Sequence, residues 1–150
     1  MFAEHSAAFT HTPIFPLQSQ YDAWQTGHVL KHGNDPAVVN LMGKNITERM
    51  FANIFTNHPD SGAFLDSCHH HCGALPPHAI GAGAGAGAGA ERCVCCGTGS
   101  WNSIRINGDL VSVAMAKWYD NIGKFTAGAP GPDRVWNQDK PYECTACCKP

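Results

Sequence analysis

The sequence has few charged residues and no marked excess of either sign. Aspartate, glutamate, lysine and arginine make up 15% of the 150 residues, and the formal net charge at pH 7 is -2. Such a balance offers no electrostatic reason for binding nucleic acid or an anionic membrane surface. We therefore expect neither nucleic acid nor a membrane as a partner.

Long apolar runs are also missing. No stretch approaches the roughly 20 apolar residues that a helix needs to span a bilayer. The opening segment, MFAEHSAAFTHT, lacks the basic start and the apolar stretch of a signal peptide. Hydrophobic residues nevertheless make up 43% of the chain, and its length is that of one domain with a real core. We expect residues 1–150 to belong to a single domain.

Cysteine and histidine are abundant instead, with eight and nine residues. The cysteines form three groups, at 68 and 72, at 93, 95 and 96, and at 144, 147 and 148. An even number of cysteines favours disulfides in an oxidising compartment. The alternative is a zinc site, because Cys68-His69-His70-His71-Cys72 offers plausible ligands. The adjacent pairs at 95–96 and 147–148 do not match the separated knuckles of zinc modules, so disulfides are favoured and no metal is expected.

One further pattern agrees with an oxidising compartment. Asn45-Ile46-Thr47 is an acceptor triplet for N-glycosylation. Together with the cysteines it favours a secreted protein, located outside the cell or in the cell wall. A missing N-terminal part is the simplest explanation for the absent signal peptide.

Two short apolar segments are typical of strands. The first covers residues 13–20 and contains Pro16, which cannot donate to a central ladder. The second covers residues 63–67. A short helix is expected after the first, running through Val29 and Leu30. Because the two strands would be neighbours in one sheet, the residues that follow them should meet at the same edge.

Two longer helices are also expected. One covers about 46–57, with Asn45 and Glu48 in the relation of a capping box, after a turn at 33–36. A capping role for the Asn45 side chain would compete with a glycan on the same amide. The other helix covers about 110–119, with Asp109 as its cap. Trp24 and Trp118 are most simply core aromatics.

Two segments are expected to lie outside the packed core. Residues 73–100 contain the alternating Gly-Ala tract, whose composition cannot bury enough surface to offset its chain entropy. We interpret them as a flexible, disordered insertion. The tail beyond Gly123 is rich in proline and glycine, and we expect disulfides rather than packing to hold it. The order of elements predicts an α/β fold, forming the last part of a larger sheet.

Four blocks follow one another in an informative order: YDAWQ at 21–25, FLDSCHHHC at 64–72, Trp101 with AKWYD at 116–120, and KPYECTACC at 140–148. They resemble the YDxWQ, F-[IL]-[DN]-S-C-x-x-H-C, W…AVxDWYYDR and CPYPCNPTC segments of the pectin acetylesterase/Notum family. The resemblance implies the C-terminal portion of an α/β-hydrolase-like sheet with flanking helices.

The resemblance also implies catalytic roles. A serine hydroxyl becomes nucleophilic when an imidazole takes its proton and a carboxylate orients that imidazole. The chain order in α/β-hydrolases is Ser, Asp, His. By the family motif, Asp22 is the carboxylate and His71 the base, because His71 stands three residues after Cys68. His69 and His70 occupy variable positions and inherit no role.

The sequence departs from the family by what it lacks. None of its seven serines lies in a Gly-x-Ser-x-Gly turn, and Ser67 belongs to the strand-to-loop turn of the motif. We therefore expect the nucleophile and the oxyanion donors to lie outside this chain, and the chain alone to be inactive. No cofactor is expected.

The resemblance therefore predicts a carboxylic ester hydrolase when the protein is complete. Its expected substrate and partner is acetylated pectic polysaccharide, because the four sequence blocks resemble the motifs of plant pectin acetylesterases most closely. A Notum-like lipid-ester hydrolase is one alternative. An inactive, secreted, disulfide-held binding module is another, and a Cys/His zinc protein is a third.

Overall fold

The computed structural model describes residues 7–30, 35–56, 58–71, 104–125, 131–142 and 144. The Gly-Ala insertion at 73–100, Trp101 and six of the eight cysteines lie outside these residues. The described elements are η1 (Ala7–Phe9), β1 (Leu17–Ser19), α2 (Ala23–His28), α3 (Pro36–Met50), η2 (Phe51–Phe55), β2 (Ala63–Asp66), β3 (Arg105–Ile106), β4 (Asp109–Leu110), α4 (Val111–Asp120) and β5 (Val135–Asn137).

A parallel sheet of three strands, in the order β1-β2-β5, forms the centre of the described structure. Phe64 of β2 pairs with Leu17 on one side and with Trp136 on the other. All four residues of β2 are buried, which explains why Ala63, Phe64 and Leu65 form a continuous apolar run rather than an alternating pattern; the fourth residue is the buried Asp66. The two predicted strands are therefore neighbours, as expected.

The first strand is shorter than predicted, but the chain runs beside β2 from Ile14 onward. The carbonyl of Ile14 accepts from the Gly62 amide, and the carbonyl of Pro16 accepts from the Phe64 amide, each at 3.0 Å. Because β1 pairs with one neighbour in the described sheet, Pro16 needs only to accept on that side. Proline is thus compatible with this position.

The tail beyond Gly123 contains a strand that the sequence reading missed. Residues 135–137 form β5, and Trp136 is fully buried against the core. This part of the tail is therefore held by packing and by backbone hydrogen bonds to β2, contrary to the expectation that disulfides rather than packing hold the tail. Three residues give too short a pattern to be recognised among prolines and glycines.

The long helix begins ten residues before its predicted start. Asp35 is the N-cap, its side chain accepting from the Ala37 amide, and Pro36 occupies the first turn. The predicted turn at 33–36 therefore ends in a helix start, and Asn45 lies within α3. The predicted capping box at Asn45 and Glu48 is therefore wrong. Because the Asn45 side chain does not cap a helix, capping does not compete with glycosylation at that residue. The helix continues as one π-helical segment, η2.

The second long helix agrees with its predicted range, but its cap does not. Leu110 is the N-cap of α4, without a side-chain cap hydrogen bond. Asp109 lies in β4, where its carboxylate accepts from Lys117 Nζ and from the Trp136 indole at 2.7–2.9 Å. An Asn107-Gly108 turn with φ of 54° and 87° joins β3 to β4, and this pair favours tight hairpins.

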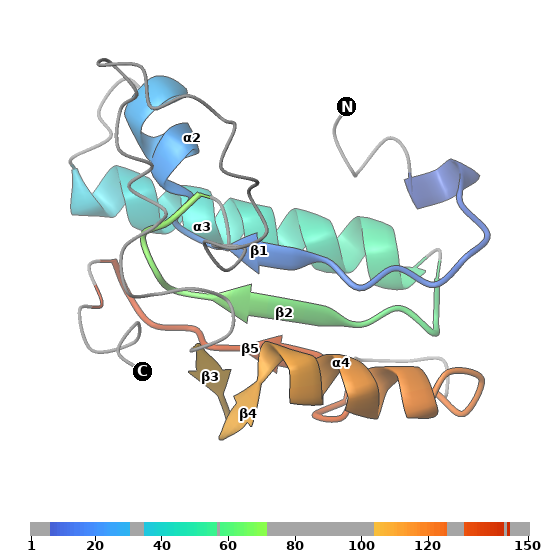
Figure 1. The fold of residues 1–150 in the computed structure, drawn as a ribbon. Helices are drawn as coiled ribbons and strands as arrows, with labels where there is room; N and C mark the ends of the chain where they lie inside the picture. The colour runs from blue at the N-terminus through green and yellow to red at the C-terminus, as the bar shows by residue number, and fades with distance from the viewer. Residues whose placement is uncertain are drawn as a thin grey trace, which may run out of the picture.

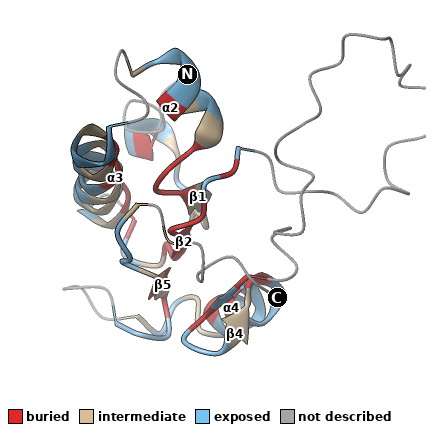
Figure 2. Ribbon diagram, turned by 90° about the vertical axis from the view of Figure 1, so that its left-hand side faces the viewer, coloured by how far each residue is buried: buried red, intermediate tan, exposed pale blue. Residues whose placement is uncertain are grey.

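Helices lie on both sides of the sheet, α3 on one and α4 on the other (Figures 1 and 2). The core cluster on the α4 side joins Phe64 and Trp136 of the sheet to Val111, Ala114 and Trp118 of α4. The arrangement is α/β: a parallel sheet with helices on both faces, as expected. The two loops that leave β1 and β2 emerge at the same end, beside α2 (Figure 1).

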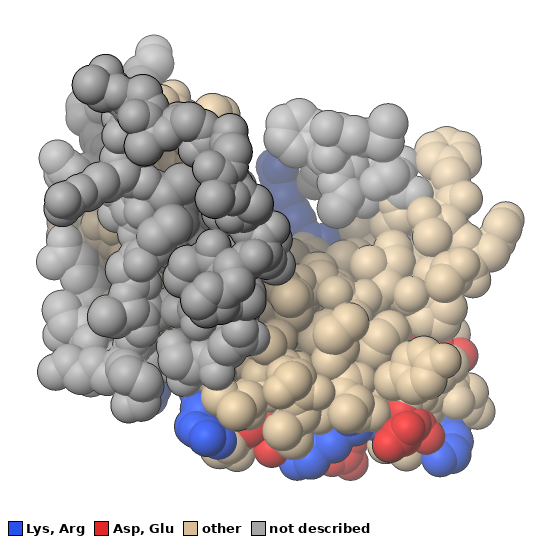
Figure 3. All heavy atoms as spheres, viewed as in Figure 1, with Lys and Arg blue, Asp and Glu red and all other residues tan. Residues whose placement is uncertain are grey.

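Charged side chains of both signs alternate along the edge beside α4, and the described part of the surface above them is largely uncharged in the view of Figure 3. None of the helices in the described residues has the length and apolarity required to cross a bilayer.

Candidate active site

Asp22 follows β1 and caps α2. One carboxylate oxygen, Oδ1, accepts from the Gln25 amide at 2.8 Å, which explains why the helix begins at Ala23. The residue is buried, so the carboxylate is held in one orientation. Its second oxygen remains available to a group from a neighbouring loop.

That group is the imidazole of His71, from the loop after β2. Nδ1 of His71 lies 2.8 Å from Oδ2 of Asp22. An ionised carboxylate only accepts, so Nδ1 carries the proton and Nε2 is the basic nitrogen of the neutral ring. The His71 side chain is 42% exposed and the Asp22 side chain 7%. The imidazole is thus reachable from outside while the carboxylate that it contacts is shielded.

The two loops are joined by several further hydrogen bonds. The Ser19 hydroxyl donates to the carbonyl of Cys68, and the Ala23 amide donates to the carbonyl of His70 at 3.2 Å. The Gln20 amide donates to the carbonyl of Asp66 at 2.9 Å. Because both loops leave adjacent parallel strands, these bonds fix the register of one loop against the other.

The serines near the pair have structural roles. Ser67 is buried, its hydroxyl donating to Gln20 Oε1 and accepting from the Lys140 amide, both at 3.0 Å. The Ser19 hydroxyl is occupied by Cys68 and by the Tyr21 amide. This agrees with the interpretation of Ser67 as part of a turn.

Trp24 covers the imidazole of His71. The two rings are stacked, with centroids 5.9 Å apart and planes at 28°, and the His28 ring stacks on Trp24 at 5.2 Å. Trp24 is 49% exposed, so its interpretation as a core aromatic is wrong. For Trp118, which is buried in the cluster on α4, it is confirmed. Trp24 is exposed because its helix lies at the end of the sheet rather than over a face.

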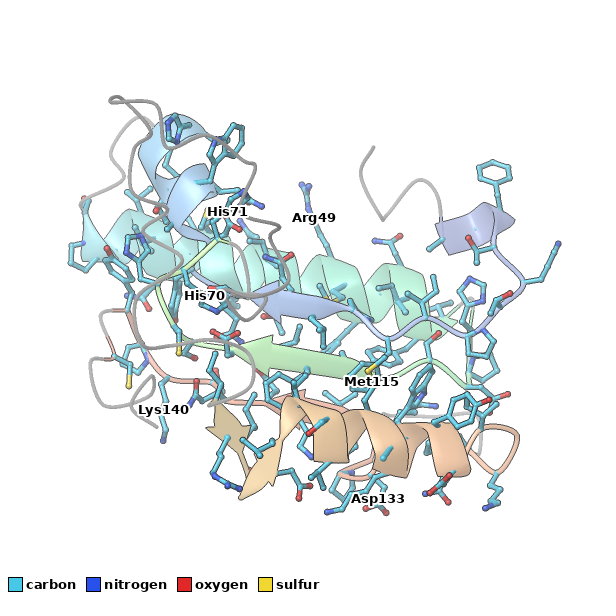
Figure 4. All side chains as sticks on the ribbon, in the orientation of Figure 1. Arg49, His70, His71, Met115, Asp133 and Lys140 are labelled. Atoms are coloured by element: carbon cyan, nitrogen blue, oxygen red, sulfur yellow. The ribbon has the colours of Figure 1, made fainter. Side chains whose placement is uncertain are left out.

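The neighbouring histidines differ from His71 and from each other. His69 is exposed, and its Nε2 lies 2.8 Å from the Thr26 hydroxyl. His70 is buried, and its Nε2 lies 2.9 and 3.0 Å from the two oxygens of Asp66. Figure 4 shows His71 beside α2 and His70 nearer the strand ends.

Sequence reasoning missed the Asp66–His70 pair. The available signal was an aspartate at the end of an apolar strand, followed four residues later by a histidine. Burial raises the pKa of the Asp66 carboxyl above its ordinary value, and the hydrogen bond from His70 opposes that shift.

A separate cavity of about 480 Å³ lies between α3 and the segment after β5. Tyr21, Asn40, Gly43, Thr47 and Lys140 are among its lining residues. Tyr21 closes one wall, its hydroxyl donating to the carbonyl of Lys140 at 2.7 Å. Neither Asp22 nor His71 lines this cavity.

No group of three or more His, Cys, Asp or Glu side chains within the described ranges could hold a metal ion. Most of the cysteines on which the zinc alternative depends lie outside these ranges.

No family model, curated protein or solved structure matches this chain.

Proposed function

We propose that this chain supplies the base and the orienting carboxylate of a carboxylic ester hydrolase. The observation that carries the proposal is the 2.8 Å contact between His71 Nδ1 and Asp22 Oδ2. The two residues follow adjacent parallel strands, in the chain order that hydrolase triads use for their acid and base. The resemblance of the surrounding motifs to the pectin acetylesterase/Notum family supports the same assignment.

The reaction follows from the protonation pattern of the pair. His71 Nε2 accepts the proton of a serine hydroxyl while the serine oxygen attacks the ester carbonyl. The imidazolium then donates that proton to the leaving alcohol as the C–O bond breaks. Water repeats the sequence on the acyl-serine, releasing the acid and restoring the serine. Asp22 stabilises the imidazolium throughout and keeps the Nδ1 proton.

Other parts of the machinery come from outside this chain in the proposal. These are the nucleophilic serine and the backbone amides that stabilise the oxyanion. The proposed substrate is an acetyl ester on pectic polysaccharide, and the proposed location is extracellular. The half-exposed His71 is compatible with a substrate as large as a polysaccharide, since such a chain must approach the base from the surface.

The test uses the complete protein, including the segment that bears the serine, and measures acetate release from acetylated pectin. His71→Ala should lower turnover by a factor on the order of 10⁴ to 10⁶. His69→Ala is the matched control: it removes an exposed imidazole two positions away and should retain most of the turnover.

Three other results would count against the proposal. Release of a fatty acid from a lipid ester, without acetate release from pectin, would favour the Notum-like substrate. Wild-type protein without either activity, but with retained binding to pectin, would favour the inactive binding module. Near wild-type turnover by His71→Ala would overturn the assignment of the base.

A further inference from the structure

A second aspartate–histidine pair lies directly beneath the first. His70 Nε2 lies 2.9 Å from Asp66 Oδ1 and 3.0 Å from Oδ2, and the Cys68 amide donates to the same Oδ1 at 2.8 Å. The Asp66 side chain is fully buried and that of His70 is 7% exposed. The carboxylate thus receives bonds from two positions of the loop that carries His71.

Burying this carboxylate is costly, because a charge taken out of water loses its hydration. Hydrogen bonds from the Cys68 amide and the His70 imidazole offset that cost. Any other conformation of the loop would leave the buried carboxylate without these two donors. A pair of this kind therefore specifies a single loop conformation more strongly than an apolar contact would. The pair therefore matters because it fixes the conformation of the loop that carries His71.

The Asp66–His70 pair is linked to the Asp22–His71 pair by one peptide bond and by one backbone hydrogen bond. His71 is the next residue after His70, so the backbone orientation of one sets that of the other. The carbonyl of His70 accepts from the amide of Ala23, which follows Asp22. The buried pair thus holds the backbone on both sides of the Asp22–His71 contact.

The two pairs are not interchangeable as catalysts. A general base must reach the hydroxyl that it deprotonates, within hydrogen-bond distance. The side chain of His71 is 42% exposed, whereas that of His70 is almost entirely enclosed. His70 is therefore not placed to meet a substrate.

We propose that Asp66 and His70 are positioning residues, which hold the loop at 67–71 so that the His71 imidazole meets Asp22. The inference rests on the proposed function for its catalytic meaning, but the position of His71 can be tested without catalysis. A proton held between imidazole and carboxylate exchanges slowly with water, and its NMR resonance is displaced strongly downfield. The Nδ1 proton of His71 therefore reports the Asp22–His71 contact directly.

The experiment compares this resonance in the 150-residue chain and its variants. His70→Ala should lose it, while the melting transition stays cooperative. His70→Gln should retain it, because the glutamine amide can still donate to Asp66. His69→Ala, which removes the imidazole on the other side of His70, should also retain it. Asp66→Asn should weaken it, since an amide offers one acceptor oxygen in place of two.

The readouts separate the two proposals. In the complete protein, His70→Ala should lower kcat by about 10²-fold with little change in KM, and His70→Gln should restore kcat.

A cooperatively folded His70→Ala variant that keeps the His71 resonance would overturn the positioning role. If His70→Ala does not fold, loss of the resonance in folded His70→Gln, or full retention in Asp66→Asn, would overturn it. Absence of the resonance in the wild type would overturn the Asp22–His71 contact and both proposals. Missing esterase activity with the expected resonances counts only against the proposed function.

Discussion

Asp22 and His71, 49 positions apart in the chain, meet at 2.8 Å because each follows one of two adjacent parallel strands. The same aspartate caps α2 through its other oxygen. One carboxylate thus serves the local helix and the long-range contact at once, and these two roles can be separated by substitution.

Asp22→Asn should separate them. Asparagine caps helices about as well as aspartate, so the free energy of unfolding should change little. Turnover of the complete protein should fall by roughly 10⁴-fold, because an amide can favour the wrong imidazole tautomer and cannot balance the cation. Asp22→Ala should lose the cap as well and cost about 1 kcal/mol more in denaturant unfolding. Equal turnover in Asp22→Asn and wild type would contradict the orienting role.

Gly62→Ala should be strongly destabilising. A Cβ atom there would lie 2.6 Å from Phe15 Cδ2, 2.7 Å from Trp118 Cδ1 and 2.8 Å from the carbonyl oxygen of Arg134. The last of these belongs to the backbone and cannot rotate away, so we expect a loss of about 1–3 kcal/mol in urea unfolding.

Gly27→Ala is the control for that measurement. It lies exposed in α2 with nothing within 4 Å of an added Cβ. Replacing glycine by alanine within a helix should stabilise the protein by roughly 0.5–1 kcal/mol. A larger loss for Gly27→Ala than for Gly62→Ala would contradict the packing described here.

Two aspartates should give stability profiles of opposite slope against pH. The pKa of Asp66 is raised above 3.8, mainly by burial, so the folded state binds more protons than the unfolded state just above that pH. Its contribution to stability should therefore fall as the pH rises from 3.8 through the raised pKa. Asp66→Asn should remove this decline in urea unfolding measured at successive pH values.

Asp109 is the opposite case. Hydrogen bonds from Lys117 and then Trp136 hold the pKa of its carboxyl below 3.8. The stability that it contributes is therefore complete above 3.8 and is lost as the pH falls through the lowered pKa. Asp109→Asn should reduce the loss of stability on the acid side. A steeper acid loss in that variant would contradict the assignment.

We predict that most cysteines are oxidised. The two that the structure describes, Cys68 and Cys144, both take part in disulfides. Titration of the unfolded, unreduced chain should therefore find far fewer free thiols than the same titration after reduction, which should find eight. Each bridge typically contributes about 2–4 kcal/mol. Eight free thiols without reduction, or one zinc per chain by elemental analysis, would support the zinc alternative.

Local patterns in the sequence predicted several features of the fold. The apolar segments around Ile14 and Phe64 predicted two neighbouring strands, and the apolar spacing along 110–119 predicted α4. These features depend on side chains close together in sequence, which a periodic pattern records. The assignment of His71 had another source, the resemblance of a motif, and its catalytic role stays a prediction.

Tertiary structure alone decided the rest. Residues 135–137 become a strand because β2 offers them a partner, and Trp24 stays 49% exposed on a helix that no other layer of the described residues covers. Among three adjacent histidines, the loop backbone alone determines that His69 meets Thr26, His70 meets Asp66 and His71 meets Asp22. Consecutive side chains in a loop point in different directions, and no local pattern encodes those directions. For His69 and His71 they follow from hydrogen bonds to Thr26 and Asp22, 43 and 49 positions away, which exist only once the sheet has formed. His70 meets Asp66 only four positions away, but its carbonyl accepts from the amide of Ala23 in the neighbouring loop.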